Sequence, residues 1–402
     1  MNDSGNSMWR NRLVLWRPVL GLAAVQASII LSWVIYRAYL PQLLTPLGFP
    51  ESFPARLLLI ESLLGIAMEP MMGGLSDRAK YAIGTRFPLI SLGVILSSAS
   101  FLLIPATLFV GTPGGALRWV LPCVAVAWAL AMTVFRAPVM ALVMHYAAVP
   151  ELPRAISVLV LVAGTMGAIA PFSTQFLLSL GPWIAFAAGS LVMLVAVKVL
   201  RSRHPPEPPA PPPAEAIVPL PSLLLGLGAI SGVSMGVHWG LRFLSGVLSE
   251  AIVIPYPDAN LKIVTFLFGL AVAVGSVPAG IVAAKWGNSR AILVGVAVTV
   301  YLVLLMGFVP QPGGIVAAIV GIVAAFSLVN NGAIPFIFGA VPPHRIGLGM
   351  GTYFGSLGAA ASLFEPLFGT QAIDLADRAT YSAIAFLAVG LCVALTEVRR
   401  RR

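Results

Sequence analysis

The sequence predicts an all-α membrane protein in which twelve transmembrane helices form two six-helix, pseudo-symmetric bundles. Three observations support this fold class. Of the 402 residues, 59% are hydrophobic and only 9% are charged, whereas a soluble domain carries about 25% charged residues. The chain contains twelve apolar stretches, and a proline-rich run separates the sixth from the seventh. This composition excludes a water-soluble enzyme, a disordered chain and a small disulfide scaffold.

The twelve apolar stretches account for most of the chain. A transmembrane helix needs about 20 predominantly apolar residues, and each stretch reaches or exceeds that length. Several stretches are longer than the bilayer requires, so tilted helices or protruding ends are expected. In chain order the stretches are 18–40, 55–75, 88–110, 116–147, 155–178, 180–200, 222–250, 260–284, 290–310, 313–341, 346–369 and 377–397.

Basic residues are distributed unevenly along this layout. With the N-terminus inside, 17 of the 24 Lys and Arg residues fall on the inner side, 4 in outer loops and 3 within stretches. The positive-inside rule therefore places both termini in the cytoplasm, and we expect the chain in the inner (plasma) membrane of a bacterium. The same asymmetry explains the net charge of +10, so the lipid bilayer, and not nucleic acid, is the expected partner. We expect a monomer, because the twofold layout needs no second subunit.

The proline-rich run defines the domain organisation. Residues 205–213 read PPEPPAPPP, a composition that favours an extended chain and excludes a helix. We assign residues 201–221 to a cytoplasmic linker. It joins an N-terminal six-helix bundle, residues 1–200, to a C-terminal six-helix bundle, residues 222–402.

The two halves share a local pattern after their fourth stretch. In each half an arginine is followed by glycines 10 and 13 positions later. These residues are Arg154, Gly164 and Gly167 in the first half and Arg345, Gly355 and Gly358 in the second. Matching patterns at equivalent places indicate a duplicated six-helix unit. Parallel repeats of six helices, with a site at their interface near the middle of the membrane, are a transporter architecture.

One motif carries a family resemblance. It runs from Glu69 through Gly74, Ser76, Asp77 and Arg78, and continues as Gly84-Thr85-Arg86. It resembles the loop between helices two and three of the major facilitator superfamily. The longer gap before Gly84 and the later Pro88 resemble one branch, the glycoside–pentoside–hexuronide:cation symporters and their sucrose-transporter relatives. This resemblance implies secondary active symport by alternating access, with a small polar solute as substrate and a sugar or glycoside favoured.

The resemblance to this branch is incomplete. Melibiose-type members carry two acidic residues four positions apart in the second helix. Here Glu69 fills one place and Gly65 the other, so coupling to H+ is favoured over Na+. The bacteriochlorophyll-delivery proteins of phototrophs share the Gly…Ser-Asp loop and a similar layout. The alternative function is therefore a non-transporting membrane factor for pigment delivery or photosynthetic-complex assembly, and it stays open.

Ionisable residues within the stretches are few. Each costs at least about 2.5–3.5 kcal/mol if it faces lipid, so each needs a partner or water. A rise of about 1.5 Å per residue sorts them into two depth layers of mixed sign, within which pairing is expected. The outer layer comprises Arg37, Glu61, His238, Arg242 and Glu365, and the inner layer Glu69, Arg136 and His145.

These residues and their polar neighbours give the candidate sites. For coupling we predict Glu69, Arg136 and Glu61, since a carboxylate that alternates between an arginine and an apolar environment couples proton binding to conformational change. Polar side chains on stretches one, seven and ten, which together with stretch four line the central cavity in the major facilitator fold, give a predicted substrate cavity. That set is Gln26, Trp33, Arg37, Ser234, His238, Arg242, Asn330 and Asn331. Glu365 is the predicted outer gate.

A charged cluster at the inner helix ends is predicted to act as a conformational latch. Its members are Gly74, Asp77, Arg78, Arg86, Arg154 and Arg345. Simpler structural roles remain open: Glu69 bonding Arg78, and Arg37 and Arg242 reaching outward to lipid headgroups. The sequence contains no nucleotide-binding G-x-x-x-x-G-K-[ST] and no clustered metal ligands. We therefore predict no enzyme activity, no cofactor and no metal site.

Overall fold

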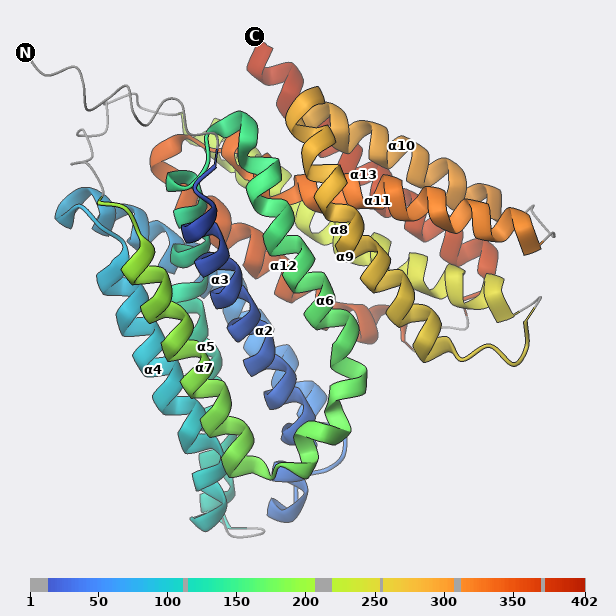
Figure 1. Cartoon of the computed structure of the whole chain (residues 1–402). Coiled ribbons are helices and arrows are strands. Elements are labelled where there is room, and N and C mark those ends of the chain that lie inside the picture. Colours follow the sequence, from blue (N-terminus) through green and yellow to red (C-terminus); the bar gives the residue numbers. More distant parts are fainter. Residues whose placement is uncertain are drawn as a thin grey trace, which may run out of the picture.

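The computed structural model describes residues 14–110, 115–206, 219–253, 256–306, 312–369 and 373–401. Most of the predicted linker, residues 207–218, lies outside the described residues. The described chain is nearly all helical (Figure 1). This confirms the predicted fold class.

Twelve long helices correspond one to one with the twelve predicted stretches. Eleven of the described helices are long and apolar enough to cross a membrane. The remaining long helix, α12, is rich in glycine and therefore less apolar. The helices are α2 (Trp16–Leu44), α3 (Phe53–Ile83), α4 (Phe87–Ala106), α5 (Val120–Met140), α6 (Leu152–Ser179), α7 (Pro182–Arg203), α8 (Leu220–Val253), α9 (Leu261–Trp286), α10 (Asn288–Met306), α11 (Pro312–Ala340), α12 (Ile346–Phe368) and α13 (Leu375–Arg401).

Proline and short 3-10 turns mark many helix boundaries. Proline stands in the first turn of α3, α4, α6 and α7, where its missing N–H costs nothing. Short 3-10 segments lengthen or introduce several helices. They are η1 (Thr45–Leu47), η2 (Thr107–Phe109), η3 (Ala116–Trp119), η4 (Ala141–His145), η5 (Val149–Glu151) and η6 (Pro343–Arg345).

Helix α3 is longer than the sequence predicts. The stretch was expected to end at residue 75, with the Gly74–Arg78 motif in a loop, but α3 continues to Ile83. It ends at Gly84, whose φ of +79° belongs to the left-handed region that glycine adopts readily. The charged motif therefore lies on a helix, which fixes the directions of its side chains.

The packing repeats from one half to the other. In the first half α2 packs on α6 and α7, and α5 packs on α3 and α4. In the second half α8 packs on α12 and α13, and α11 packs on α9 and α10. The two main contacts between halves, α3 with α12 and α6 with α9, are also counterparts of each other. The chain therefore forms two pseudo-symmetric six-helix bundles. Figure 1 shows the helices of the two halves as two groups that lie side by side.

The bundles approach each other more closely at one end. Helix α12 also packs on α5, and α11 on α6, whereas within the described residues neither α2 nor α8 packs comparably on the opposite bundle. Asn331 Nδ2 donates to the carbonyl of Pro153 at 3.0 Å, and Ser276 Oγ to that of Ser157 at 2.9 Å. Away from this end the helices of the two bundles diverge (Figure 1). The closed end is the one that the charge distribution predicts to be cytoplasmic.

Candidate functional site

A cavity of about 260 Å³ lies between the two bundles. Its walls come from α2, α3, α5, α8 and α12. Six of the predicted coupling and substrate residues line it together, although they are scattered over 206 positions of the sequence. They are Trp33, Arg37, Glu61, Glu69, Arg136 and His238. The structure thus brings part of each predicted depth layer into one central site, whereas Arg242, Glu365 and His145 do not line this cavity.

The centre of this site is an ion pair between Glu69 and Arg136. The Glu69 side chain is 1% exposed, and its Oε1 accepts a hydrogen bond from Arg136 Nε at 2.8 Å. Arg136 Nη2 lies 2.5 Å from the same oxygen. The guanidinium also lies 4.9 Å from the ring centroid of Phe354, on α12. The arginine of this first-bundle ion pair therefore contacts an aromatic ring of the second bundle. Glu69 thus pairs with Arg136, as expected for two oppositely charged residues of the inner layer. The alternative that Glu69 bonds Arg78 is wrong.

The second carboxylate of the cavity has a tyrosine partner. Tyr36 donates its hydroxyl to Glu61 Oε1 at 2.5 Å, and both residues are buried. The ring of Tyr36 packs against the fully buried Trp128, at 4.6 Å between centroids. Arg37 lies over the ring of Trp33 at 5.8 Å. Sequence reasoning missed Tyr36, although it lies one helical turn after Trp33 and so on the same face of α2.

A second cavity of about 190 Å³ adjoins the first. The two share His238, Phe354 and Leu357 in their walls. Gln26 of α2 and Asn330 of α11, both predicted cavity residues, line this second space. Its remaining walls are mostly apolar and come from α5, α6, α8 and α12. The predicted cavity helices one, four, seven and ten are therefore present, and α3, α6 and α12 contribute as well.

Several predicted cavity residues lie elsewhere. Ser234 is buried and donates to the carbonyl of Tyr353 at 2.8 Å, so it joins α8 to α12. Asn331 is fully buried in its contact with α6, outside both cavities. For these two residues the cavity prediction is wrong, because a helical period shows a polar stripe without showing whether solvent or another helix faces it.

Arg242 and Glu365 form a more exposed ion pair. Their side chains are 46% and 68% exposed, and Arg242 Nη2 lies 2.5 Å from Glu365 Oε1. Arg242 also lies over the ring of Phe364 at 4.7 Å. Both partners belong to the second bundle, and neither lines the two cavities. The predicted gate residue therefore has a charged partner, but the pair does not itself link the bundles.

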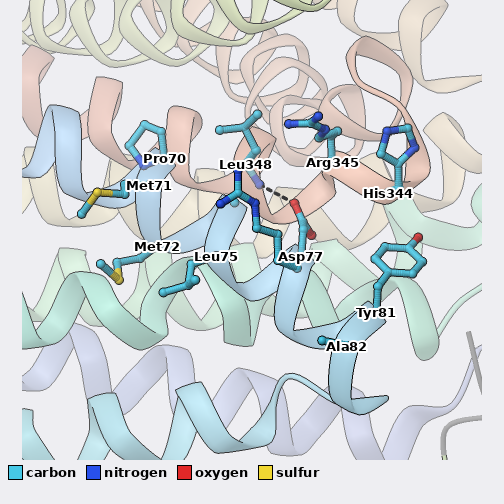
Figure 2. A pocket seen from close by; sticks show the side chains of 12 residues that line it. Pro70, Met71, Met72, Leu75, Asp77, Tyr81, Ala82, His344, Arg345 and Leu348 are labelled. Atoms are coloured by element: carbon cyan, nitrogen blue, oxygen red, sulfur yellow. Dashed lines mark hydrogen bonds between the residues drawn. The ribbon is translucent and has the colours of Figure 1, made fainter. Parts of the chain in front are cut away.

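Asp77 joins the bundles at their closed end. Its Oδ1 accepts from Arg86 Nη2 at 2.7 Å and from the backbone N–H of Gly347 at 2.9 Å. Its Oδ2 accepts from the N–H of Leu348 at 2.9 Å, the contact drawn in Figure 2. One carboxylate is thus paired with an arginine of its own bundle and bound to the N-terminus of α12, where unsatisfied N–H groups favour negative charge.

The remaining predicted latch residues do not all take part in this contact. Arg154 pairs with Glu151 at 2.9 Å within its own bundle. Arg78 and Arg345 are exposed and line a groove beside Asp77. The close helix approach is made by Gly73, not Gly74: a Cβ on Gly73 would overlap the carbonyl oxygen of Gly347.

No family model matches the chain. Several solved structures resemble it over nearly their whole length. The human organic anion transporter MFSD10 is 15% identical, with 94% of this chain and 99% of that chain covered and a TM-score of 0.66. A bacterial homologue of the iron transporter ferroportin, in an outward-facing state, is also 15% identical, with 96% and 100% covered and a TM-score of 0.70. The E. coli fucose:proton symporter is 12% identical, with 94% and 98% covered and a TM-score of 0.65.

At these identities the similarity shows the fold. The chain has the twelve-helix major facilitator fold, and these solved relatives of the fold are transporters. The finer resemblance, to the glycoside–pentoside–hexuronide:cation symporters, stays a prediction.

Proposed function

We propose that the chain is a secondary active transporter that moves a small polar solute by alternating access, with H+ as the coupling ion. The observation that carries this proposal is the buried Glu69–Arg136 ion pair, which lines a cavity between two bundles. Charged residues inside a membrane protein are costly and mark substrate or ion pathways. The similarity to solved transporters of the same fold supports the same conclusion.

The chemistry of the cavity walls supports a polyhydroxylated solute. Among the described residues, four buried polar atoms of the two cavities have no hydrogen-bond partner: Gln26 Oε1, Trp33 Nε1, Glu61 Oε2 and Glu69 Oε2. Three of these are acceptors, so a solute that satisfies them must bring several donors. Trp33 and Phe354 offer rings that pack on the apolar face of a sugar. A sugar or glycoside fits these requirements.

The charge balance of the cavity disfavours a strongly cationic solute. Arg37 and Arg136 line the same space as Glu61 and Glu69, so the fixed charges come close to cancelling. A strongly charged solute would lose its hydration on entering this site of low dielectric constant, and fixed charges that nearly cancel would give it little net attraction in return. A neutral solute meets no such penalty.

Proton coupling follows from the pairing of Glu69. A proton on this carboxylate removes its attraction to Arg136 and frees the guanidinium to bind solute or to move with α5. A buried charge that loses its partner is destabilising, so the pair links protonation to a change in packing. A sodium site shared by both carboxylates is disfavoured, because Glu61 and Glu69 lie eight residues apart on α3, about 12 Å along the helix axis.

The structure supports an outward-facing arrangement for this transporter. Its closed end carries the Asp77 contact with α12, and the charge distribution predicts that this end is cytoplasmic. The structure of the bacterial ferroportin homologue, with a TM-score of 0.70, is also in an outward-facing state. The opposite state then requires Asp77 to leave α12 while the bundles close at the other end.

The first experiment identifies the solute. The purified protein is heated with sugars, glycosides, amino acids, small organic acids and tetrapyrroles, at mildly acidic and at neutral pH. A ligand that binds the folded state raises the apparent melting temperature by mass action. We expect a sugar or glycoside to stabilise the protein in a pH-dependent way. Stabilisation by tetrapyrroles alone would contradict the transporter proposal and support the pigment-delivery alternative.

The second experiment tests coupling in proteoliposomes with the identified solute. We expect Glu69→Gln to abolish proton-driven accumulation while solute counterflow continues, because the amide keeps the side-chain shape but cannot exchange a proton. The matched control is Glu51→Gln, an exposed acid in the turn before α3, which should accumulate solute as the unmodified protein does. If Glu69→Gln still accumulates solute against its gradient, Glu69 is not the proton carrier.

A further inference from the structure

A large groove runs along the outside of the closed end. It has a volume of about 860 Å³ and lies between α3 of the first bundle and the η6–α12 segment of the second. It shares no lining residue with the two central cavities. The nearest approach along α3 is from Pro70, which lines the groove, to Glu69, which lines the cavity of about 260 Å³. Figure 2 shows its apolar side chains gathered toward one end and Tyr81 and His344 toward the other.

The polar end of the groove has an excess of positive charge. Arg78 and Arg345 both line it and are exposed. In the described part of the chain, neither guanidinium has a hydrogen-bond or ion-pair partner. The one acidic side chain of the groove, Asp77, is fully engaged by Arg86 and the backbone of α12. Arg78 and Arg345, which come from opposite bundles, are therefore both available to bind one anionic group. Guanidinium groups bind phosphate particularly well.

The other end of the groove is suited to a hydrocarbon chain. Met71 and Leu75 are 53% and 43% exposed, and Met72 and Leu348 complete the apolar wall. Methionine side chains adapt to flexible apolar ligands. Met71 precedes Arg78 by seven residues on α3, which places it about 10 Å further along the helix toward the middle of the membrane. The groove therefore matches an amphiphile with an anionic head and an apolar tail.

We infer that this groove binds an anionic phospholipid of the predicted cytoplasmic leaflet, with its phosphate between Arg78 and Arg345 and an acyl chain along Met71 and Leu75. Basic pockets between transmembrane helices on the cytoplasmic side recognise anionic headgroups. Because the two arginines belong to different bundles, the bound lipid bridges them beside the Asp77 contact. It therefore favours the arrangement in which this end is closed.

Lipid titration of the purified full chain, followed by native mass spectrometry, tests this inference. The probes are phosphatidylglycerol and phosphatidylcholine with identical acyl chains. We expect phosphatidylglycerol to bind more tightly, and Arg78→Gln/Arg345→Gln to weaken its binding about tenfold or more, since each arginine makes a charge-assisted contact with the phosphate. The control Lys285→Gln/Arg290→Gln removes two exposed cations elsewhere at the same predicted membrane face and should bind as the unmodified protein does.

A second pair of variants keeps the test valid if the double arginine variant fails to fold. Ala82 lines the groove and is exposed near the end of α3, so Ala82→Glu adds repulsion without disturbing the core. We expect Ala82→Glu to weaken phosphatidylglycerol binding and Ala82→Gln to leave it unchanged. Equal binding of the two lipids, unchanged binding in the arginine and Ala82→Glu variants, or complete displacement of the lipid by free glycerol phosphate would each overturn the assignment.

Discussion

At the scale of single residues, Glu69 and Arg136 depend on each other. The Glu69 side chain is 1% exposed and that of Arg136 20% exposed, so the contact between them compensates part of the desolvation of both charges. Removing one partner of such a pair costs about 3–5 kcal/mol in soluble proteins, while removing both with apolar replacements is often nearly neutral. The pair is therefore a sensitive probe of how this cavity is stabilised.

We expect Arg136→Leu to lower the midpoint temperature of heat-induced aggregation more than Glu69→Gln/Arg136→Leu does, because the double variant leaves no uncompensated carboxylate. The measurement is the fraction of monodisperse protein after heating, followed by size-exclusion chromatography. A double variant as unstable as the sum of both single variants would show that the two side chains act independently.

The residue scale also shows how far the sequence could predict the site. Depth along the helices placed Glu69 beside Arg136 correctly, because oppositely charged groups at one depth must find each other in a membrane. The same reasoning did not find the Tyr36–Glu61 hydrogen bond, because it sorted only charged and histidine side chains by depth and a tyrosine hydroxyl is neutral. Ser234 and Asn331 were assigned to the cavity in error, since their partners are backbone carbonyls that leave no sequence signal.

At the scale of secondary-structure elements, α3 and α12 approach each other so closely at one glycine position that backbone meets backbone. A Cβ on Gly351 would overlap the carbonyl oxygen of Glu69, whereas a Cβ on Gly358, two turns later on α12, would meet nothing within 4 Å. Glycine permits close helix approach in membrane proteins at a cost in helix propensity. These two positions therefore form a natural comparison on one helix.

We expect Gly351→Ala to destabilise the protein by about 1–3 kcal/mol, the cost of overpacking a close contact. We expect Gly358→Ala to be neutral or stabilising by up to about 1 kcal/mol, because alanine is the better helix former. Denaturant unfolding in detergent micelles, followed by circular dichroism, measures both. Equal effects of the two substitutions would mean that α3 and α12 separate easily at Gly351.

Element boundaries were predicted well where apolar composition alone defines them, as for α7 and α9. The prediction was wrong for the end of α3. The apolar run ends at Leu75 because Ser76, Asp77 and Arg78 are polar. These polar residues nevertheless continue the helix, which ends only at Ile83, before Gly84. A hydropathy pattern reports where the bilayer ends, and a helix can extend into the aqueous phase.

At the scale of the whole molecule, the two-bundle organisation was predictable from the PPEPPAPPP run and the repeated Arg…Gly…Gly pattern. The arrangement of the bundles relative to each other was not. An outward-facing and an inward-facing state bury nearly the same helix faces, so one hydrophobic pattern is compatible with both. The choice between them depends on a few contacts, such as Asp77 with α12, whose partners are backbone groups.

Cross-linking the bundles tests whether they must separate. Ser62 of α3 and Ser362 of α12 have hydroxyl oxygens 2.5 Å apart, a proximity compatible with a disulfide. In a Cys123→Ser/Cys392→Ser background, we expect oxidation of Ser62→Cys/Ser362→Cys to stop solute counterflow and reductant to restore it. The two single-cysteine variants serve as controls and should be insensitive to oxidant. Full counterflow in the oxidised protein would show that the cycle does not separate α3 from α12 here.

The Asp77 contact with α12 also has a consequence for rates. Two hydrogen bonds from backbone N–H groups to a carboxylate contribute about 1.5–3 kcal/mol each. Every 1.4 kcal/mol corresponds to a factor of ten, so in the proposed transport cycle this contact would slow opening by roughly two to four orders of magnitude. A collective bundle motion that otherwise takes about 1 μs would then take roughly 0.1–10 ms. In the proposed transport cycle, the Asp77 carboxylate would therefore set the rate at which the closed end opens. Its loss would make opening more frequent rather than stop it.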